Sequence, residues 1–196
     1  TGNPRRPKYK VVLIAGHAGT GKTTLATVVA KHAGYSITEV NASDDRNVAV
    51  FERRIEDSMR TVRTLDAGKK PLCLLLDEID GAPADSIRVL CDIINKTGKK
   101  CIRRPIICIC NNLYTPSLRE LRAIALVLQM PYANEQRLTD RLREIAQAEN
   151  VRIDTSALTT LVSACGCDLR LCLNCLQYLA AHFADSYIDS QMILKY

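Results

Sequence analysis

Short apolar runs alternate with amphipathic stretches along most of the chain up to residue 130. The runs lack a regular alternation of apolar and polar residues, which is typical of strands covered on both faces of a sheet. Five such runs predict strands, at residues 10–15, 35–40, 72–76, 105–110 and 125–130. Three amphipathic stretches predict helices between them, at residues 22–33, 48–63 and 84–95. This order predicts an α/β fold, a parallel sheet flanked by helices whose strands end at one ligand-binding edge.

The pattern changes after Pro131, where strand-like runs give way to helical periodicity. Three helices are predicted, at residues 134–150, 154–165 and 168–184. In the first of them Leu138, Leu142 and Ala146 recur at the spacing of one helical face. We therefore predict an α/β domain over residues 1–132 and a small helical domain over residues 133–196.

Composition is that of a globular protein. Of 196 residues, 47% are hydrophobic and 24% are charged, which excludes a disordered chain. The 27 basic and 21 acidic residues give a net charge of +6, which is compatible with a phosphate-rich partner. The longest apolar stretches, such as residues 72–76 and 106–110, are too short to cross a bilayer, so we expect a soluble protein without a membrane partner. Because the chain starts at Thr1 without a signal-peptide pattern, we expect a fragment or a processed protein.

Nine cysteines raise the question of disulfides or zinc. An odd number in predicted strands and helices favours a reducing compartment over a disulfide framework. Cys165, Cys167, Cys172 and Cys175 cluster in the sequence, but Cys172 and Cys175 fall within a continuous apolar helix instead of a metal-binding turn. We therefore expect the cysteines to pack as small hydrophobic residues, and we expect no zinc.

The segment from Gly16 to Thr23 fits the phosphate-loop pattern G-x-x-x-x-G-K-[ST], and it lies between a predicted strand and a predicted helix. In such a loop backbone N–H groups surround phosphate oxygens, and the helix N-terminus adds positive potential. Lys22 would contact the β- and γ-phosphates, and the Thr23 hydroxyl would bind Mg²⁺. The predicted ATP contacts here are Gly16, His17, Ala18, Gly19, Thr20, Gly21, Lys22, Thr23 and Thr24.

Two acids follow the apolar run at residues 72–76. Asp77 and Glu78 would stand at the carboxyl end of that strand, beside the phosphates. Asp77 is predicted to bind Mg²⁺ together with Thr23, and Glu78 to polarise the attacking water. An acidic pair after a strand is weak evidence alone, since many strands end in solvent-facing acids, but the phosphate loop upstream favours the catalytic interpretation.

Two further residues are candidates for sensing the γ-phosphate. Asn111 follows the fourth predicted strand, where a neutral amide could contact water or phosphate. Asn111 and Asn112 could instead form a turn. Arg170 stands near the start of the last predicted helix, where its guanidinium could reach the γ-phosphate or remain a solvated surface group.

Together, the phosphate loop, Asp77-Glu78, Asn111 and Arg170 resemble an AAA+ ATPase with a three-helix lid. The segment Asn41-Ala-Ser-Asp-Asp-Arg46 is similar to a signature of the replication factor C clamp loaders. The stretches at residues 77–83 and 104–118 resemble the large subunits of alternative clamp loaders associated with chromosome transmission fidelity and sister-chromatid cohesion. The resemblance covers residues 7–182.

This resemblance implies a nuclear ATPase that uses ATP and Mg²⁺ to open a sliding clamp and place it on primer–template DNA. It implies a ring shared with small clamp-loader subunits. Lys22 and Thr23 match the phosphate and metal contacts, and Asp77 and Glu78 the metal and water residues. Asn111 matches the first sensor and Arg170 the second.

The chain departs from the family pattern at two places. Small clamp-loader subunits carry Ser-Arg-Cys where this chain has Ala123-Ile124-Ala125, and Arg119 and Arg122 are out of register, so we expect no arginine finger. The phosphate loop has His17-Ala18 where the family often has two prolines, which predicts a less rigid loop and weaker nucleotide binding.

Two basic segments are candidates for DNA contact. Arg53, Arg54, Arg60 and Arg63 have acids interleaved, so a solvated helix face with internal ion pairs explains them equally well. The loop at residues 96–104 has five basic residues and no acid. Because the chain lacks Trp and has 5% aromatic residues, DNA binding would be directed at the backbone and depend on salt.

Three functional hypotheses remain open at this point. The chain is a motor subunit that hydrolyses ATP while loading a clamp, or a scaffold that needs bound ATP but not hydrolysis at its own site. The third hypothesis is another DNA-linked AAA+ machine, such as an initiator or a branch-migration helicase.

Overall fold

A computed structural model describes residues 8–44, 48–60, 70–96, 104–183 and 187–193 of the chain. The chain divides into two compact units, residues 1–16 with 21–130, and residues 17–20 with 131–196. Within the described part, no helix is both long and apolar enough to span a bilayer.

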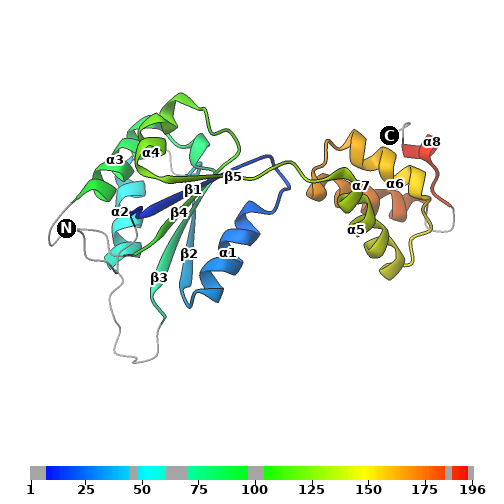
Figure 1. Ribbon diagram of the computed structural model, residues 1–196, viewed down its shortest axis with the longest axis horizontal. Helices are drawn as coiled ribbons and strands as arrows, with labels where there is room; N and C mark the ends of the chain where they lie inside the picture. The colour runs from blue at the N-terminus through cyan, green and yellow to red at the C-terminus, as the bar shows by residue number, and fades with distance from the viewer. Residues whose placement is uncertain (1–7, 45–47, 61–69, 97–103, 184–186, 194–196) are drawn as a thin grey trace. The chain divides into compact units, whose positions relative to one another are not determined.

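The first unit contains the predicted sheet, and its five strands are all parallel (Figure 1). The strands are β1 (Val11–Ala15), β2 (Ser36–Asn41), β3 (Leu72–Asp77), β4 (Ile106–Cys110) and β5 (Leu126–Gln129), in the spatial order β2-β3-β4-β1-β5. The parallel α/β fold and its five predicted strands are therefore confirmed. Pairing aligns Ala15 with Cys110 and Leu76 with Cys108, so the residues that follow β1, β3 and β4 emerge at neighbouring positions on one edge.

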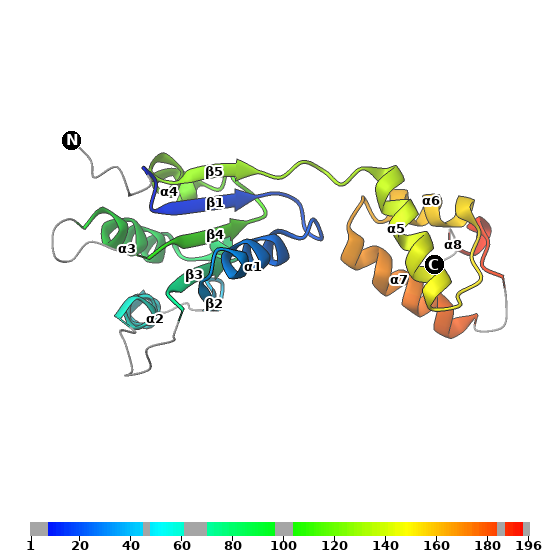
Figure 2. The same ribbon diagram turned by 60° about the horizontal axis from the view of Figure 1, so that its bottom comes forward.

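Helices cover both faces of the sheet, as the buried strands require. They are α1 (Lys22–His32), α2 (Val48–Arg60), α3 (Ala84–Asn95) and α4 (Arg119–Ile124). Phe51 of α2 and Leu90 of α3 pack with Leu13 and Leu74 in the larger core. Ala26 of α1 packs with Ile14, Leu75 and Ile109 on the opposite face (Figure 2). The sequence reading missed α4, because six residues are too few to establish a helical period.

The second unit is a helical bundle, made of α5 (Glu135–Ala148), α6 (Thr155–Ala164), α7 (Leu169–His182) and the short α8 (Ser190–Ile193). Each of the three long helices has a side-chain N-cap: the carbonyl or carboxylate oxygens of Asn134, Asp154 and Asp168 accept hydrogen bonds from N–H groups of the first turn. Leu142, Leu158 and Leu176 are among the buried residues of its core. The three long helices match the predicted ones, and α8 was not predicted.

The described cysteines are free thiols, and five of them are buried: Cys73, Cys91, Cys108, Cys110 and Cys172. Burial raises the pKa of Cys110 to about 12 and that of Cys73 to about 11, so both remain protonated at neutral pH. Protonated buried thiols of this kind pack as small apolar groups. Among the residues with described placement, no group of three or more His, Cys, Asp or Glu side chains is arranged to hold a metal ion.

Candidate nucleotide site

Three neighbouring strands place the predicted phosphate-binding and acidic residues at one edge of the sheet. The glycine-rich loop follows β1, Asp77 ends β3, and Asn111 follows β4. Because β4 pairs with both β1 and β3, these three segments are adjacent although they are far apart in the sequence. The hydrogen bonds of Lys22, Thr23, Glu78 and Asn111 described below all join residues of the first unit, whereas residues 17–20 of the loop belong to the second.

The end of the glycine-rich loop has the backbone that phosphate binding requires. Gly19 and Gly21 have φ angles of 69° and 82°, in the left-handed region that disfavours residues with a Cβ. Gly21 is also the N-cap of α1 and has no side chain with which to cap the first N–H groups of the helix. No acidic residue lies in the first turn, so this helix end presents N–H donors and positive potential to an anion.

Lys22 connects the loop to the end of β4. Its side chain is 7% exposed, and its Nζ donates to the Gly16 carbonyl at 2.7 Å and to Asn111 Oδ1 at 2.8 Å. A buried ammonium group must have acceptors, and here these two are uncharged oxygens. Phosphate oxygens would be stronger acceptors for the same group, because the hydrogen bond would then join two opposite charges.

Thr23 and Asp77 bring two hard oxygen ligands together. Thr23 Oγ1 donates to Asp77 Oδ2 at 2.7 Å, and Asp77 Oδ1 accepts from the backbone N–H of Glu78 at 2.8 Å. Hydroxyl and carboxylate oxygens are ligands that Mg²⁺ prefers, usually with water and substrate phosphates completing the shell. The donor set therefore fits the predicted metal.

Replacing Thr23 by alanine tests this pairing. We expect the Mg²⁺ concentration for half-maximal ATP turnover to rise about tenfold. Loss of one residue in or next to a metal site typically weakens metal binding by about this factor. Thr27→Ala, one turn further along α1, is the matched control and should leave the Mg²⁺ titration unchanged. Identical Mg²⁺ titrations for Thr23→Ala and the wild type would contradict a metal role for Thr23.

Glu78 adopts an unusual backbone conformation at the end of β3. Its φ of 53° lies in the left-handed region, which costs a residue other than glycine about 1–3 kcal/mol. Its exposed side chain accepts a hydrogen bond at Oε2 from Ser43 Oγ at 2.9 Å. Ser43 Oγ also lies 2.8 Å from Asn41 Oδ1, which already accepts from the Ser43 N–H. The Ser43 hydroxyl has a single hydrogen to donate. Because Asn41 Oδ1 already accepts from the Ser43 N–H, we assign the hydroxyl hydrogen to Glu78 Oε2.

The contact with Ser43 was not predicted from the sequence. Ser43 and Asp44 are described in the structure, whereas Asp45 and Arg46 of the clamp-loader-like segment lie outside the described residues. The resemblance of residues 41–46 to clamp loaders indicated that this segment is functional. It did not indicate that Ser43 contacts Glu78, because that contact depends on how the strands pair. The pairing of β2 with β3 creates this contact by aligning Asn41 with Asp77.

Asn111 and Asn112 have separate roles. Asn112 Oδ1 accepts from the N–H of Tyr114 at 3.0 Å, as in a turn, whereas Asn111 Oδ1 accepts from Lys22. The backbone N–H groups of both residues donate to Asp80 Oδ2, at 3.1 Å from Asn111 and 2.9 Å from Asn112. No role for Asp80 was predicted from the sequence.

The remaining predicted residues lie on exposed or partly exposed positions. His17 and Ala18 are exposed, Thr20 Oγ1 donates to the His17 carbonyl at 2.8 Å, and Thr24 is exposed in the first turn of α1. Arg170 belongs to the second unit, where it is the second residue of α7 and is exposed. Its role at the γ-phosphate stays a prediction.

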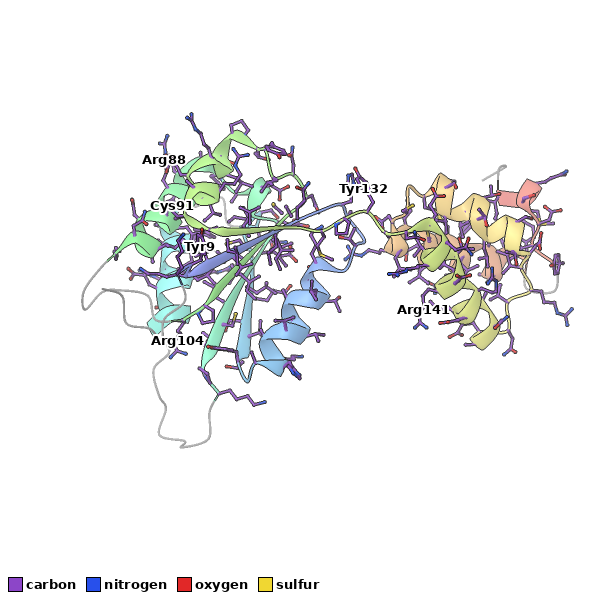
Figure 3. All side chains as sticks on the ribbon, in the orientation of Figure 1. Tyr9, Arg88, Cys91, Arg104, Tyr132 and Arg141 are labelled. Carbon is purple, nitrogen blue, oxygen red and sulfur yellow. The ribbon has the colours of Figure 1, made fainter. Side chains whose placement is uncertain are left out.

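The candidate DNA contacts are only partly described. Arg53 and Arg54 are exposed on α2, whereas Arg63 and residues 97–103 lie outside the described residues, as does the Arg60 side chain. Arg88 and Arg141 project from the outer faces of α3 and α5 (Figure 3), where they pair with Asp85 at 3.4 Å and Glu144 at 2.7 Å on the same helices. Exposed pairs of this kind contribute little to stability.

The segment at residues 119–125, where we expect no arginine finger, also has a defined structure. Ala123 and Ile124 end α4, and Ala125 is buried before β5. Arg119 is exposed, and the Arg122 guanidinium lies 5.3 Å from the centre of the Tyr114 ring. Arg122 thus has an aromatic neighbour in its own unit.

Comparisons with known proteins show the family of the chain. The model of the ATPase family associated with various cellular activities (AAA) matches residues 12–132. The human chromosome transmission fidelity protein 18 homolog is 43% identical over 197 residues, covering 89% of this chain and 20% of the human protein. The Saccharomyces cerevisiae chromosome transmission fidelity protein 18 is 35% identical, covering 91% of this chain and 27% of its own length.

A replication factor C large subunit from Sulfurisphaera tokodaii is 33% identical, covering 94% of this chain and 41% of its own length. These relatives confirm the resemblance to large clamp-loader subunits, and the chain spans well under half of the length of each. Among solved structures, the Thermotoga maritima RuvB Holliday junction branch migration motor matches with a TM-score of 0.69 and 18% identity, over 95% of this chain and 60% of that one. At this identity the likeness concerns the fold.

Proposed function

This chain belongs to the ATPase family associated with various cellular activities, and we propose that it is the ATPase region of a clamp-loader large subunit. In this proposal residues 1–132 form the ATP-binding domain and residues 133–196 its helical lid. The observation that carries the proposal is the meeting of Lys22 with Asn111 and of Thr23 with Asp77, at 2.8 and 2.7 Å, at the carboxyl edge of the sheet. This is where a nucleotide triphosphate would place its phosphates.

ATP binding would use the loop from Gly16 to Thr24. Backbone N–H groups at the start of α1 would donate to phosphate oxygens, and Lys22 would exchange its present uncharged acceptors for phosphate. Thr23 and Asp77 would hold Mg²⁺, which when bound neutralises charge on the phosphates. Asn111, whose amide lies 2.8 Å from Lys22 Nζ, would stand beside the γ-phosphate that this lysine binds.

Hydrolysis would use Glu78 as the general base. Its carboxylate would accept a proton from a water molecule as the water oxygen attacks the γ-phosphorus, and ADP and inorganic phosphate would leave. The contact with Ser43 Oγ supports a defined position for this carboxylate before substrate arrives. Arg170 of the second unit would contact the γ-phosphate and so relate the lid to the occupancy of the site.

The assembly proposed from the relatives is a ring with small clamp-loader subunits that acts on a sliding clamp at primer–template DNA. We propose a nuclear role in replication and in sister-chromatid cohesion on the same grounds. Without an arginine at Ala123-Ile124-Ala125, this subunit would accept a finger from a neighbour and not donate one. DNA contact would involve the phosphate backbone.

A scaffold that binds ATP without needing to hydrolyse it is the alternative. The observation that favours it is the phosphate loop, which has His17-Ala18 where the family often has two prolines. The absent finger agrees with it as well. The Glu78→Gln variant separates the two candidates.

The proposal as a whole is tested by reconstitution. The full-length protein that carries this chain is combined with small clamp-loader subunits, a sliding clamp and circular primed DNA. We expect stable clamp–DNA linkage with ATP and none with ADP, and a fall of about tenfold or more in loading as salt rises from about 50 to 200 mM, because phosphate contacts release counterions. Loading that proceeds equally when this subunit is omitted would overturn the proposal.

A further inference from the structure

Asp80 lies in the short 3-10 helix Ile79–Gly81, directly after the two proposed catalytic acids. Its Oδ2 atom accepts two backbone hydrogen bonds, from Asn111 at 3.1 Å and from Asn112 at 2.9 Å. The carboxylate is partly buried, and the two donors belong to a segment that is 31 and 32 residues away in the chain. This contact crosses from the segment after β3 to the segment after β4.

The two N–H groups lie where the sheet stops providing partners. β4 ends at Cys110, so Asn111 and Asn112 are the first residues beyond the strand. A carboxylate that accepts from two successive N–H groups makes charge-assisted bonds, which are shorter and stronger than bonds between neutral groups. Asp80 therefore determines the direction in which the chain leaves β4.

That direction decides where the Asn111 amide stands. With its backbone held by Asp80, Asn111 places Oδ1 2.8 Å from Lys22 Nζ. Asp77 and Glu78 precede Asp80 by three and two residues. The Asp80 carboxylate thus links the segment with the proposed metal and water residues to the amide beside the phosphate-binding lysine.

We propose that Asp80 is a positioning residue that holds Asn111 in register with Lys22 and Glu78 for ATP hydrolysis. The proposal rests on the proposed function of Asn111 at the γ-phosphate. Asp80 acts through the backbone of Asn111 and makes no contact with substrate. Positioning requires an acceptor oxygen at Oδ2, and the negative charge of the carboxylate strengthens the two hydrogen bonds that this oxygen accepts.

Three variants separate positioning from a general effect on folding. Asp80→Ala removes the acceptor. Asp80→Asn keeps one oxygen, which suffices because both N–H groups bond to the same atom. Asp85→Ala is the matched control, since Asp85 is an exposed acid that contacts Arg88 at the start of α3.

The first readout is amide hydrogen exchange of the segment after β4, measured on the full-length protein without nucleotide. We expect exchange at Asn111 and Asn112 to be at least about tenfold faster in Asp80→Ala, because a solvated N–H loses its protection when its acceptor is removed. Asp80→Asn and Asp85→Ala should exchange like the wild type. Unchanged exchange in Asp80→Ala would overturn the proposal without reference to activity.

The second readout is single-turnover ATP hydrolysis in the reconstituted assembly. We expect Asp80→Ala to lower the rate about tenfold while the Kd for ATP stays within about threefold. Displacement of the Asn111 amide raises the free energy of the transition state more than that of the bound ATP complex. Asp80→Asn should restore most of the rate. The double variant Asp80→Ala with Asn111→Ala should be no slower than Asn111→Ala alone, because the two residues act as one unit.

Failure of this inference and failure of the proposed function give different results. If the wild-type assembly shows no ATP turnover, the proposed function is wrong, and the exchange experiment still tests the contact. If the wild type turns over and Asn111→Ala slows it, but Asp80→Ala keeps the wild-type rate, Asp80 is not a positioning residue. An Asp80→Ala effect that adds fully to that of Asn111→Ala would also overturn the inference.

Discussion

Lys22→Ala is expected to weaken ATP binding on the order of a hundredfold or more. Lys22 is 7% exposed, and its ammonium group already lies at hydrogen-bond distance from the loop carbonyl of Gly16 and from the Asn111 amide. Its replacement removes charge-assisted bonds to two phosphate groups in a place where water cannot easily substitute. A hundredfold loss corresponds to about 2.7 kcal/mol, which is within the range for hydrogen bonds between charged groups.

The measurement is equilibrium binding of a fluorescent ATP analogue to the full-length protein. Lys31→Ala is the matched control, since Lys31 is an exposed lysine in the last turn of the same helix. Lys22→Met keeps most of the buried stem and removes only the charge, and it should bind as poorly as Lys22→Ala. Wild-type affinity in Lys22→Met would show that the ammonium group does not contact the nucleotide.

Glu78→Gln is expected to lower ATP turnover at this site by about two to three orders of magnitude while leaving the Kd for ATP within about threefold, which is the range for removal of a general base. Glutamine has the same shape and an acceptor oxygen for Ser43 Oγ, so the hydrogen bond that positions residue 78 is preserved. The amide cannot accept the proton of the attacking water. The predicted loss therefore concerns the chemical step and not the shape of the site.

Single-turnover hydrolysis and clamp loading in the reconstituted assembly are measured together, with Glu39→Gln as a control at an exposed position of β2. If Glu78→Gln loses both hydrolysis and loading, this chain is a motor subunit. If it loses hydrolysis at this site but loads clamps normally, while Lys22→Ala fails to load, the chain is a scaffold held by ATP. Undiminished hydrolysis by Glu78→Gln at this site would exclude Glu78 as the base.

The prediction of the sheet succeeded because it depended on local signals. Each of β1, β3 and β4 is an apolar run of five or six residues that lacks alternation, and burial on both faces imposes that pattern whatever the order of the strands. The edge strands β2 and β5 are mostly exposed or half-buried. Local signals failed where an element was short. The six residues of α4 and the four of α8 do not complete the repeats from which a helical period is recognised.

The candidate site likewise contains residues that were predicted from local sequence and residues that were not. Lys22, Thr23, Asp77, Glu78 and Asn111 were predicted, because a glycine-rich motif before a helix, or a polar residue after an apolar strand, can be read within a few residues. Ser43 and Asp80 were not assigned a role in the site, although each contacts a predicted residue. In the sequence, a serine after a strand and an acid after two other acids are typical of ordinary solvent-exposed loops, so neither residue indicates a functional contact.

From the sequence alone come the candidate reactive groups: a phosphate-loop motif, an acidic pair and an amide, each after a predicted strand, in a chain with a clamp-loader resemblance. Which of these groups meet follows from the folded sheet. The partners of Lys22, Thr23 and Glu78 lie 89, 54 and 35 residues away, and the strand order β2-β3-β4-β1-β5 brings them together. The physical reason is that hydrophobic periodicity and motif spacing record the environment of a residue, whereas hydrogen bonds across neighbouring strand ends depend on the pairing of the whole sheet.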